Sequence, residues 1–325
     1  MKTLSDSFTF EDLKSWPPQL EEGTPPIRLA VFGDPVDHSL SPALQNAGLK
    51  EIHADYGYAK FHIKPDQLEE ALKLARQNDF VGVNCTIPHK LTAFSLMTNL
   101  DESAQLLGAV NTVLFEGEGM IGYNTDGRGF VRAVHAEFGM DLRDLRVMIL
   151  GAGGGAGRAL AVQCALEDCE RLILVNRTLE KAQALIKELH PHFQTPRVDA
   201  PNSRLLCVPW EEAALEAELS QIDLIVQCTS LGLKRSDPPA LAPQLLQPYH
   251  LVFDTVYRPG SNATKLVLDA RSRGARASDG LPLLLHQGAL SLEIWSEKTA
   301  PLPVMRRALY EAAGRPLSAW EDLPI

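Results

Sequence analysis

Short apolar runs alternate with segments of helical spacing from residue 28 onward. The runs at residues 28–33, 56–63, 80–86 and 109–115 predict strands. Helices are predicted between them at residues 42–53, at residues 65–78 and after Pro88. Strands that alternate with helices in this way predict an α/β domain with a parallel-type sheet.

The same pattern begins again after residue 141. Residues 146–151 and 171–176 predict buried strands, and each is followed by a predicted helix, at residues 156–167 and 179–189. Further strands are predicted at residues 205–208, 224–228 and 251–255, and the chain from residue 283 is mostly helical in pattern. The fold class is therefore α/β with two domains, of which the second is Rossmann-like and doubly wound.

Residues 1–26 lie outside this repeated pattern. They are acidic and end with Gly23, Pro25 and Pro26, which predict a loop before the first strand. We expect an N-terminal extension with a short helix at residues 10–16 and no assigned function.

Composition and charge favour a globular protein and argue against a membrane protein or a nucleic-acid-binding protein. The 325 residues are 45% hydrophobic and 22% charged, which suits two globular domains. No run approaches the roughly 20 apolar residues of a membrane helix, and the first residues lack the apolar segment of a signal peptide. A net charge of −10 argues against nucleic acid as the main partner. The five cysteines are scattered without CxxC spacing, so we expect buried thiols in a cytoplasmic protein and no metal site.

A glycine-rich turn follows the strand predicted at residues 146–151. It fits the dinucleotide fingerprint with Gly151, Gly153 and Ala156. Small residues here allow the backbone to approach a pyrophosphate, and the amides of the next helix face that anion. The alternative is a flexible turn that only packs a helix on a strand. The strand before it and the helix after it favour the cofactor site.

The end of the next predicted strand indicates the type of cofactor. An NAD site usually carries an acid at this point, but this chain has Asn176, Arg177 and Thr178, with Lys181 about one helical turn further on. A guanidinium, a hydroxyl and an ammonium suit a 2′-phosphate. The alternative is that the two cations are solvated surface residues. We predict NADP in preference to NAD.

Four polar motifs supply candidates for substrate chemistry. HSLSP contains Ser39 and Ser41, GVNCTIPHK contains Thr86 and Lys90, GAVNTV contains Asn111, and NTDG contains Asp126. Each motif alone has a structural interpretation. Serine or aspartate before a helix is commonly a cap, a lone lysine is commonly solvated, and asparagine is common in turns.

Together with further motifs, these four make the chain resemble the shikimate dehydrogenase family from about residue 28 to residue 295. The additional marks are GAGGGA, NRT, CTSLGL, DTVYRPGSNAT and DGLPLLLHQGALSLEIW. The resemblance implies NADP-dependent reduction of 3-dehydroshikimate to shikimate in the shikimate pathway. It implies a substrate domain at residues 27–126, completed by C-terminal helices at residues 281–325, and an NADP domain at residues 127–280.

The resemblance also implies residue roles. Lys90 and Asp126 would be the catalytic pair, because a positioned ammonium can donate a proton to a developing alkoxide and a carboxylate can orient it. Residues that would bind the substrate are Ser39, Ser41, Thr86, Asn111, Asp126, Tyr257 and Gln287. Residues that would bind the cofactor are Gly151, Ala152, Gly153, Gly154, Gly155, Ala156, Asn176, Arg177, Thr178, Lys181, Thr229, Ser230, Val256 and Gly280.

Two alternatives stay open at the level of the sequence. One is a quinate dehydrogenase or an enzyme that uses both quinate and shikimate. The other is a nucleotide-sensing regulator without catalysis, against which the presence of Lys90 and Asp126 counts. A monomer and a homodimer are both compatible with the sequence.

Overall fold

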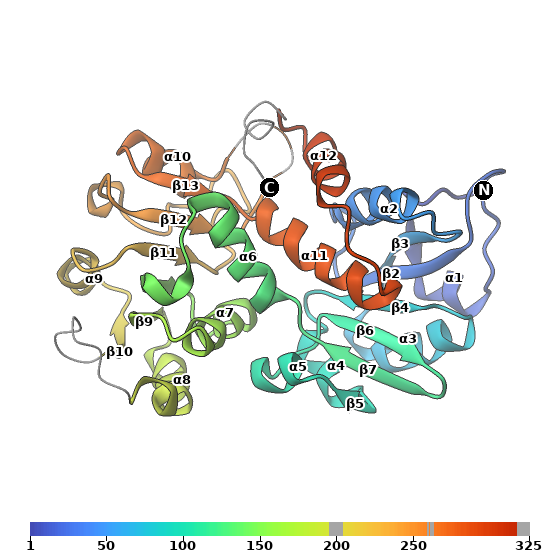
Figure 1. Cartoon of the computed structure of the whole chain (residues 1–325), viewed down its shortest axis with the longest axis horizontal. Helices are drawn as coiled ribbons and strands as arrows, with labels where there is room; N and C mark the ends of the chain where they lie inside the picture. The colour runs from blue at the N-terminus through green and yellow to red at the C-terminus, as the bar shows by residue number, and fades with distance from the viewer. Residues whose placement is uncertain (195–203, 259, 261–262, 317–325) are drawn as a thin grey trace. The chain divides into compact units, whose positions relative to one another are not determined.

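The computed structural model describes residues 1–194, 204–258, 260 and 263–316. The chain divides into two compact units (Figure 1). Unit 1 comprises Met1–Thr125 and Leu284–Ile325, and unit 2 comprises Asp126–Leu283. The C-terminal helices therefore belong with the N-terminal part of the chain, as the resemblance implied. The boundary after residue 125 assigns Asp126 to unit 2, one residue from the predicted limit.

Unit 1 contains a seven-stranded sheet in the order β1-β3-β2-β4-β6-β7-β5. Its strands are β1 Ser7–Thr9, β2 Ile27–Gly33, β3 Gly57–His62, β4 Gly82–Cys85, β5 Asn99–Leu100, β6 Thr112–Glu116 and β7 Gly119–Tyr123. Strands β1, β3, β2 and β4 are parallel, but β6 runs antiparallel to both β4 and β7. The expectation of a parallel-type sheet is confirmed for β1, β3, β2 and β4 but not for β6, because β6 and β7 form a hairpin with Gly117 in a left-handed conformation.

The helices of unit 1 bury apolar side chains, and the last of them packs against the helix that follows β2. They are α1 Phe10–Lys14, α2 Ser41–Glu51, α3 Leu68–Gln77, α4 Lys90–Leu96, α5 Glu102–Leu107, α12 Leu302–Ala312 and most of α11 Leu281–Ser296. Helix α3 follows a 3-10 turn, Pro65–Gln67, and buries Leu68, Ala71, Leu72 and Ala75, whose spacing places them on one helical face.

The N-terminal extension, which lies outside the repeated sequence pattern, is part of unit 1. Strand β1 pairs with β3, and α1 begins directly after it with Thr9 as its N-cap. Phe8 and Leu13 have no exposed surface and belong to the same core cluster as Phe61. The three-residue strand is too short for alternation to reveal it, and burial of Phe8 explains why it forms.

Unit 2 contains a six-stranded, wholly parallel sheet in the order β10-β9-β8-β11-β12-β13 (Figure 1). The strands are β8 Arg146–Leu150, β9 Arg171–Asn176, β10 Leu205–Pro209, β11 Leu224–Gln227, β12 Leu251–Asp254 and β13 Arg276–Ser278. The α-helices of this unit are α6 Asp126–Phe138, α7 Gly155–Leu166, α8 Leu179–Leu189, α9 Glu212–Leu219 and α10 Lys265–Ser272. This order confirms the Rossmann-like fold, and the strand order reverses between β8 and β11, where such folds bind ligands.

Candidate active site

The loops after β2 and β4 are joined by backbone hydrogen bonds at one edge of the unit 1 sheet. Thr86 N donates to Phe32 O at 3.0 Å, and Asp34 N donates to Ile87 O at 3.0 Å. A Cβ on Gly33 would lie 2.6 Å from Cγ2 of Thr86, so only glycine permits this approach. The segment of residues 34–41 comprises the loop after β2, with Ser39, and the first residue of α2, Ser41, and is called the serine loop below.

The serine loop holds its two hydroxyls in different surroundings. Ser39 Oγ accepts a hydrogen bond from Ser41 N at 3.3 Å, a contact two residues along the chain and not the helix N-cap that the motif alone suggested. Ser41 is the first residue of α2 and is only 8% exposed, and the N-cap position, Leu40, makes no side-chain cap. Burial raises the pKa of Tyr58 well above its usual range, while a hydrogen bond with Ser41 acts in the opposite direction.

Asn111 is the centre of a buried polar cluster in unit 1. Its Nδ2 donates to Thr125 Oγ1 at 2.9 Å and to Gln287 Oε1 at 3.3 Å. Its Oδ1 accepts from Thr125 N and from Thr112 Oγ1, both at 2.9 Å. Asn111 lies in a bend directly before β6 and is only 2% exposed, so its side chain holds a buried cluster together in addition to its place in the bend. Three segments distant in the sequence meet here: the start of β6, the end of the segment after β7, and α11.

Lys90 is connected to this cluster through the backbone. It begins α4, and its carbonyl accepts from Val110 N at 3.0 Å, one residue before Asn111. Asn111 N in turn donates to Tyr123 O at 3.1 Å. Burial raises the pKa of the Cys85 thiol to about 12, and the charge of nearby Lys90 opposes this rise. Cys85 is therefore an inert core thiol, as predicted.

Asn84 is a buried residue of this cluster that was absent from the predicted site. Its Nδ2 lies 3.0 Å from Asn111 O, 3.0 Å from Thr112 Oγ1 and 3.1 Å from Ser291 Oγ. Its Oδ1 accepts from the Tyr58 hydroxyl at 2.7 Å. The sequence could have indicated this role, because Asn84 is a polar residue within an otherwise apolar strand and a buried amide requires hydrogen-bond partners. The hydrogen bonds of the Asn84 side chain therefore hold β4 in place, and Thr86 and Lys90 follow this strand.

His89 has a structural environment in unit 1. Its Nε2 lies 2.7 Å from Ile63 O, and its side chain is 1% exposed. Burial lowers the pKa of His89, so the neutral ring is favoured at neutral pH. This environment gives His89 no evident part in proton transfer.

The glycine-rich loop of unit 2 follows β8 and leads into α7. Gly151 has φ +90°, and a Cβ on it would lie 2.5 Å from Cγ2 of Thr229, at the end of the neighbouring β11. A Cβ on Gly157 would lie 2.2 Å from Gly151 O. The close contact of helix with loop therefore depends on Gly157, which the predicted fingerprint did not include. In the sequence, the only sign of this role was that Gly157 ends the glycine-rich run that begins at Gly151.

Two of the residues predicted to bind the 2′-phosphate end of NADP, Asn176 and Lys181, contact this loop. Asn176 Oδ1 accepts from Gly153 N at 3.2 Å, and a Cβ on Gly153 would lie 2.8 Å from that of Lys181. Thr178 is the residue before α8, and its carbonyl accepts from Asn176 Nδ2 at 2.8 Å. Arg177 is exposed at the end of β9. Unit 2 thus brings Gly153, Asn176 and Lys181 together.

Two further segments of unit 2 carry cofactor candidates. Thr229 Oγ1 accepts from Leu231 N at 3.1 Å, in the turn after β11 that also contains the exposed Ser230. Val256 O accepts from Gly280 N at 3.1 Å, and a Cβ on Gly280 would lie 2.2 Å from Thr255 O. These contacts join the segments that follow β12 and β13. Tyr257 directly follows Val256, and its predicted contact with a substrate carboxylate stays a prediction.

Asp254, at the end of β12, holds the Val256 segment. Its Oδ1 accepts from Val256 N at 3.0 Å and its Oδ2 accepts from Thr264 Oγ1 at 2.6 Å. Burial raises the pKa of Asp254 to about 7, with Asp279 adding to the rise and both hydrogen bonds opposing it. Asp254 therefore titrates near neutral pH while it orders a segment that carries cofactor candidates.

The described residues include neither a membrane-spanning helix nor a metal-binding cluster. None of the helices in this part of the chain is long and apolar enough to cross a membrane. The same residues contain no group of three or more His, Cys, Asp or Glu side chains arranged to hold a metal ion.

Comparison with known proteins identifies the family. Three family models match successive parts of the chain: the shikimate dehydrogenase substrate binding domain at residues 31–113, shikimate / quinate 5-dehydrogenase at residues 132–205, and the shikimate 5'-dehydrogenase C-terminal domain at residues 280–310. A protein of Desulforamulus reducens named shikimate dehydrogenase (NADP(+)) is 36% identical over 287 residues, which cover 88% of this chain and 95% of that protein.

Solved structures agree with the sequence comparison. A shikimate dehydrogenase in complex with NADP+ is 33% identical with a TM-score of 0.79, over 88% of this chain and 95% of that chain. A shikimate 5-dehydrogenase of Thermus thermophilus in complex with NADP(H) and shikimate is 33% identical with a TM-score of 0.76, over 88% of this chain and 99% of that chain. By these similarities over most of its length, the chain belongs to the shikimate dehydrogenase family.

Proposed function

We propose that this protein catalyses the reversible, NADP-dependent reduction of 3-dehydroshikimate to shikimate, a step of the shikimate pathway to chorismate and aromatic amino acids. The observation that carries the proposal is the buried cluster in which Asn111 bonds both Thr125 and Gln287. These residues belong to motifs on which the family resemblance rests. A polar cluster of this kind can present fixed donors and acceptors to the hydroxyls of a small ring.

In this proposal, Lys90 and Asp126 form the catalytic pair. NADPH supplies a hydride to the ketone carbon when it is bound, and the oxygen then needs one proton to become the alcohol. The Lys90 ammonium donates or relays that proton and stabilises the developing negative charge, while the Asp126 carboxylate keeps the amine charged and oriented. Support comes from two linked hydrogen bonds: Val110 N donates to Lys90 O, and Thr125 N, one residue before Asp126, donates to Oδ1 of the neighbouring Asn111.

The remaining substrate contacts follow the family motifs. Ser39 and Ser41 bind the carboxylate, Tyr257 is a further ligand of the substrate, and Thr86, Asn111, Asp126 and Gln287 bind the ring hydroxyls. Backbone hydrogen bonds join the serine loop to the loop that contains Thr86. They support a common location for the hydroxyls of Ser39, Ser41 and Thr86. Hydroxyl and amide groups on anchored segments suit a carboxylate and several alcohols, because each can form directed hydrogen bonds.

The cofactor contacts lie on unit 2. The loop from Gly151 to Ala156 and the start of α7 bind the pyrophosphate, since helix N-termini favour anions. Asn176, Arg177, Thr178 and Lys181 bind the 2′-phosphate end, and Thr229, Ser230, Val256 and Gly280 line the nicotinamide side. The chemistry of the donor set fits NADP: small residues at the pyrophosphate, and cations in place of the acid of an NAD site.

An absorbance assay of NADP+ reduction with shikimate tests the proposal. The same assay with quinate, and with NAD+ in place of NADP+, tests substrate and cofactor selectivity. Lys90→Ala should lower kcat by ~10²–10⁴ while NADPH binding is retained, and Lys50→Ala, an exposed lysine on α2, should have wild-type kcat. Near-normal turnover of the Lys90 variant would remove this residue from the mechanism.

The alternative functions give different results in this assay. One family model is described as shikimate / quinate 5-dehydrogenase, which keeps a quinate or dual activity as the second candidate. Faster turnover of quinate than of shikimate would favour it. Binding of NADPH without oxidation by 3-dehydroshikimate would instead favour a nucleotide-sensing regulator.

We also propose that the protein works in the cytoplasm. All five cysteines are free; Cys85, Cys164 and Cys169 are buried, and Cys207 and Cys228 are partly exposed. Free thiols are typical of a reducing compartment. Fractionation of cells that express the full chain would test the location.

A further inference from the structure

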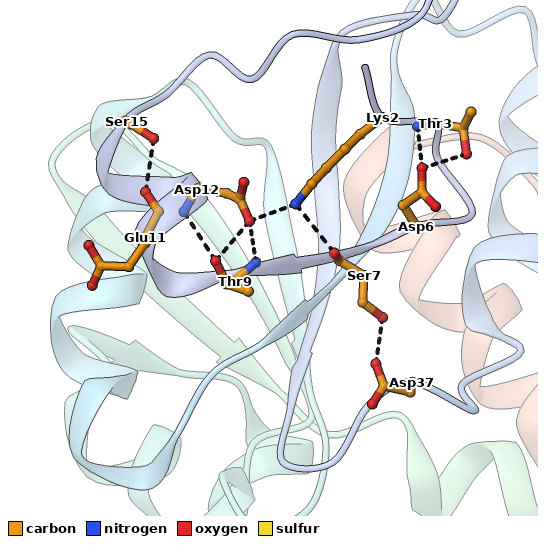
Figure 2. Close-up of polar contacts among 9 residues, drawn as sticks. All are labelled: Lys2, Thr3, Asp6, Ser7, Thr9, Glu11, Asp12, Ser15 and Asp37. Carbon is orange, nitrogen blue, oxygen red and sulfur yellow. Dashed lines mark hydrogen bonds and ion pairs between the residues drawn. The ribbon is translucent and has the colours of Figure 1, made fainter.

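The N-terminal extension contacts the serine loop directly. Ser7, in β1, donates from Oγ to Asp37 Oδ1 at 2.7 Å, and Asp37 lies two residues before Ser39 (Figure 2). The family match begins at residue 31, so Ser7 belongs to a segment outside it. A residue outside the family pattern thus contacts a loop that carries two proposed substrate ligands.

The register of the sheet explains how Ser7 reaches the loop. Strand β1 pairs with β3 so that Ser7 is opposite Lys60. Phe8 is fully buried, so Ser7 faces away from the core that Phe8 enters. Lys60 Nζ donates to Asp37 O at 2.7 Å. One residue, Asp37, is therefore held by two adjacent strands, with Ser7 on its side chain and Lys60 on its carbonyl.

The extension itself is anchored, so it can act as a fixed support. Lys2 Nζ lies 2.8 Å from Asp12 Oδ2 and 3.4 Å from Ser7 O (Figure 2). Asp12 Oδ2 also accepts from Thr9 N and Thr9 Oγ1, both at 2.8 Å. Burial raises the pKa of Asp12, but the hydrogen bonds from Lys2 and Thr9 outweigh it and lower the pKa overall. Ser7 is thus connected to a capped helix through charged hydrogen bonds.

The serine loop has further attachments on either side of Asp37. Asp34 Oδ1 lies 2.6 Å from His62 Nε2 on β3, and Asp34 N donates to Ile87 O. Ser39 N donates to Val36 O at 3.0 Å, after which α2 begins at Ser41. Because Asp37 lies between these attachments, its hydrogen bonds limit how the backbone of residues 37–39 can move.

We infer that Ser7 is a positioning residue for substrate, which acts through Asp37 to hold Ser39 and Ser41 in the geometry that binds the shikimate carboxylate. This inference rests on the proposed function of the two serines. Ser7 itself touches no substrate in this scheme. Its removal should therefore weaken substrate binding and leave hydride transfer and cofactor binding as they are.

The test uses point variants of the full chain, because deletion of residues 1–26 would remove the buried Phe8 and Leu13. Ser7→Ala should raise the KM for shikimate by about two- to fivefold, the range of an exposed polar contact, with kcat and the KM for NADP+ unchanged. Ser7→Thr keeps the hydroxyl and should restore the wild-type KM. Ser15→Ala is the matched control, since it removes an exposed hydroxyl of the same segment that donates to Glu11 O at 2.9 Å, away from the serine loop.

Hydrogen–deuterium exchange of the peptide spanning residues 34–42 provides a second readout without substrate. Exchange should be faster in Ser7→Ala than in Ser15→Ala or wild type. A KM and exchange equal to those of the control, faster exchange without a change in KM, or a joint change of kcat and both KM values would each overturn the inference. A wild-type protein inactive on shikimate would instead refute the proposed function, and the exchange comparison would still decide whether Ser7 orders the serine loop.

Discussion

Replacement of Asp254 by asparagine should change how the stability of the protein depends on pH. In the folded protein the pKa of Asp254 is raised from 3.8 to about 7, chiefly by burial. Between these two values the folded state keeps a proton that the unfolded state has lost. Stability must therefore fall as pH rises from about 4 to about 7 and be constant, for this group, above that range. Asparagine stays neutral and should remove this loss.

The size of the effect follows from the two pKa values. A difference of about 3 corresponds to roughly 4 kcal/mol of unfolding free energy at about 1.4 kcal/mol per pKa unit. The amide can still accept from Val256 N, as the carboxyl does at 3.0 Å. Asp254→Asn should thus match wild type below pH about 4, exceed it by roughly 1–2 kcal/mol at pH about 5, and exceed it by up to about 4 kcal/mol at pH about 8.

Urea unfolding followed by circular dichroism at several pH values measures this difference. Asp223→Asn is a control for which the pH dependence of stability should have the opposite sign, because folding lowers the pKa of Asp223. Burial raises the pKa of Asp223, but its hydrogen bonds with Arg146 outweigh this and lower the pKa overall. Wild type should exceed that variant at neutral pH, and the difference should shrink as pH falls through the lowered pKa. A free-energy difference between wild type and Asp254→Asn that does not change with pH would refute the reasoning.

Three further predictions concern cofactor selectivity, the glycine-rich loop and the N-terminal extension. Arg177→Ala should weaken NADPH binding more than NADH binding, as measured by fluorescence titration, and equal weakening would contradict the phosphate assignment. Gly157→Ala should lower stability by about 1–3 kcal/mol and weaken NADPH binding, because its Cβ would lie 2.2 Å from Gly151 O. Gly155→Ala, where no atom lies within 4 Å of the new Cβ, is its control for stability alone and should be near wild type in that measurement. Phe8→Ala should lower the free energy of unfolding by about 3–5 kcal/mol, and a loss below about 1 kcal/mol would show that the extension is not core.

Local sequence patterns determined the nucleotide-binding half of this protein in detail. The predicted strand and helix at residues 171–176 and 179–189 coincide with Arg171–Asn176 and Leu179–Leu189. An unbroken apolar run bounded by polar residues, and an amphipathic helix after it, carry their signal within a few neighbouring residues. The position of the glycine-rich loop between β8 and α7 was evident for the same reason.

The sequence alone did not determine the antiparallel β6–β7 hairpin or the pairing of β1 with β3. Strand β1 has three residues, so its polar and apolar alternation is too short to distinguish it from a loop. Its pairing partner begins about fifty residues later, and burial of Phe8 against Phe61, with ring centroids 5.2 Å apart, stabilises the pair. Only the tertiary structure could reveal that the extension joins the sheet.

For the candidate site too, the sequence supplied one part of the description and the tertiary structure the other. The sequence identified which polar residues belong to the family motifs, but not which of them contact one another. Asn111 bonds Thr125 and Gln287, which lie 14 and 176 residues away in the chain, and Ser7 bonds Asp37 at a separation of 30. Periodicity reports the local conformation of the backbone, whereas hydrogen bonds between distant segments depend on how the strands are ordered and aligned. That order and alignment exist only in the folded chain.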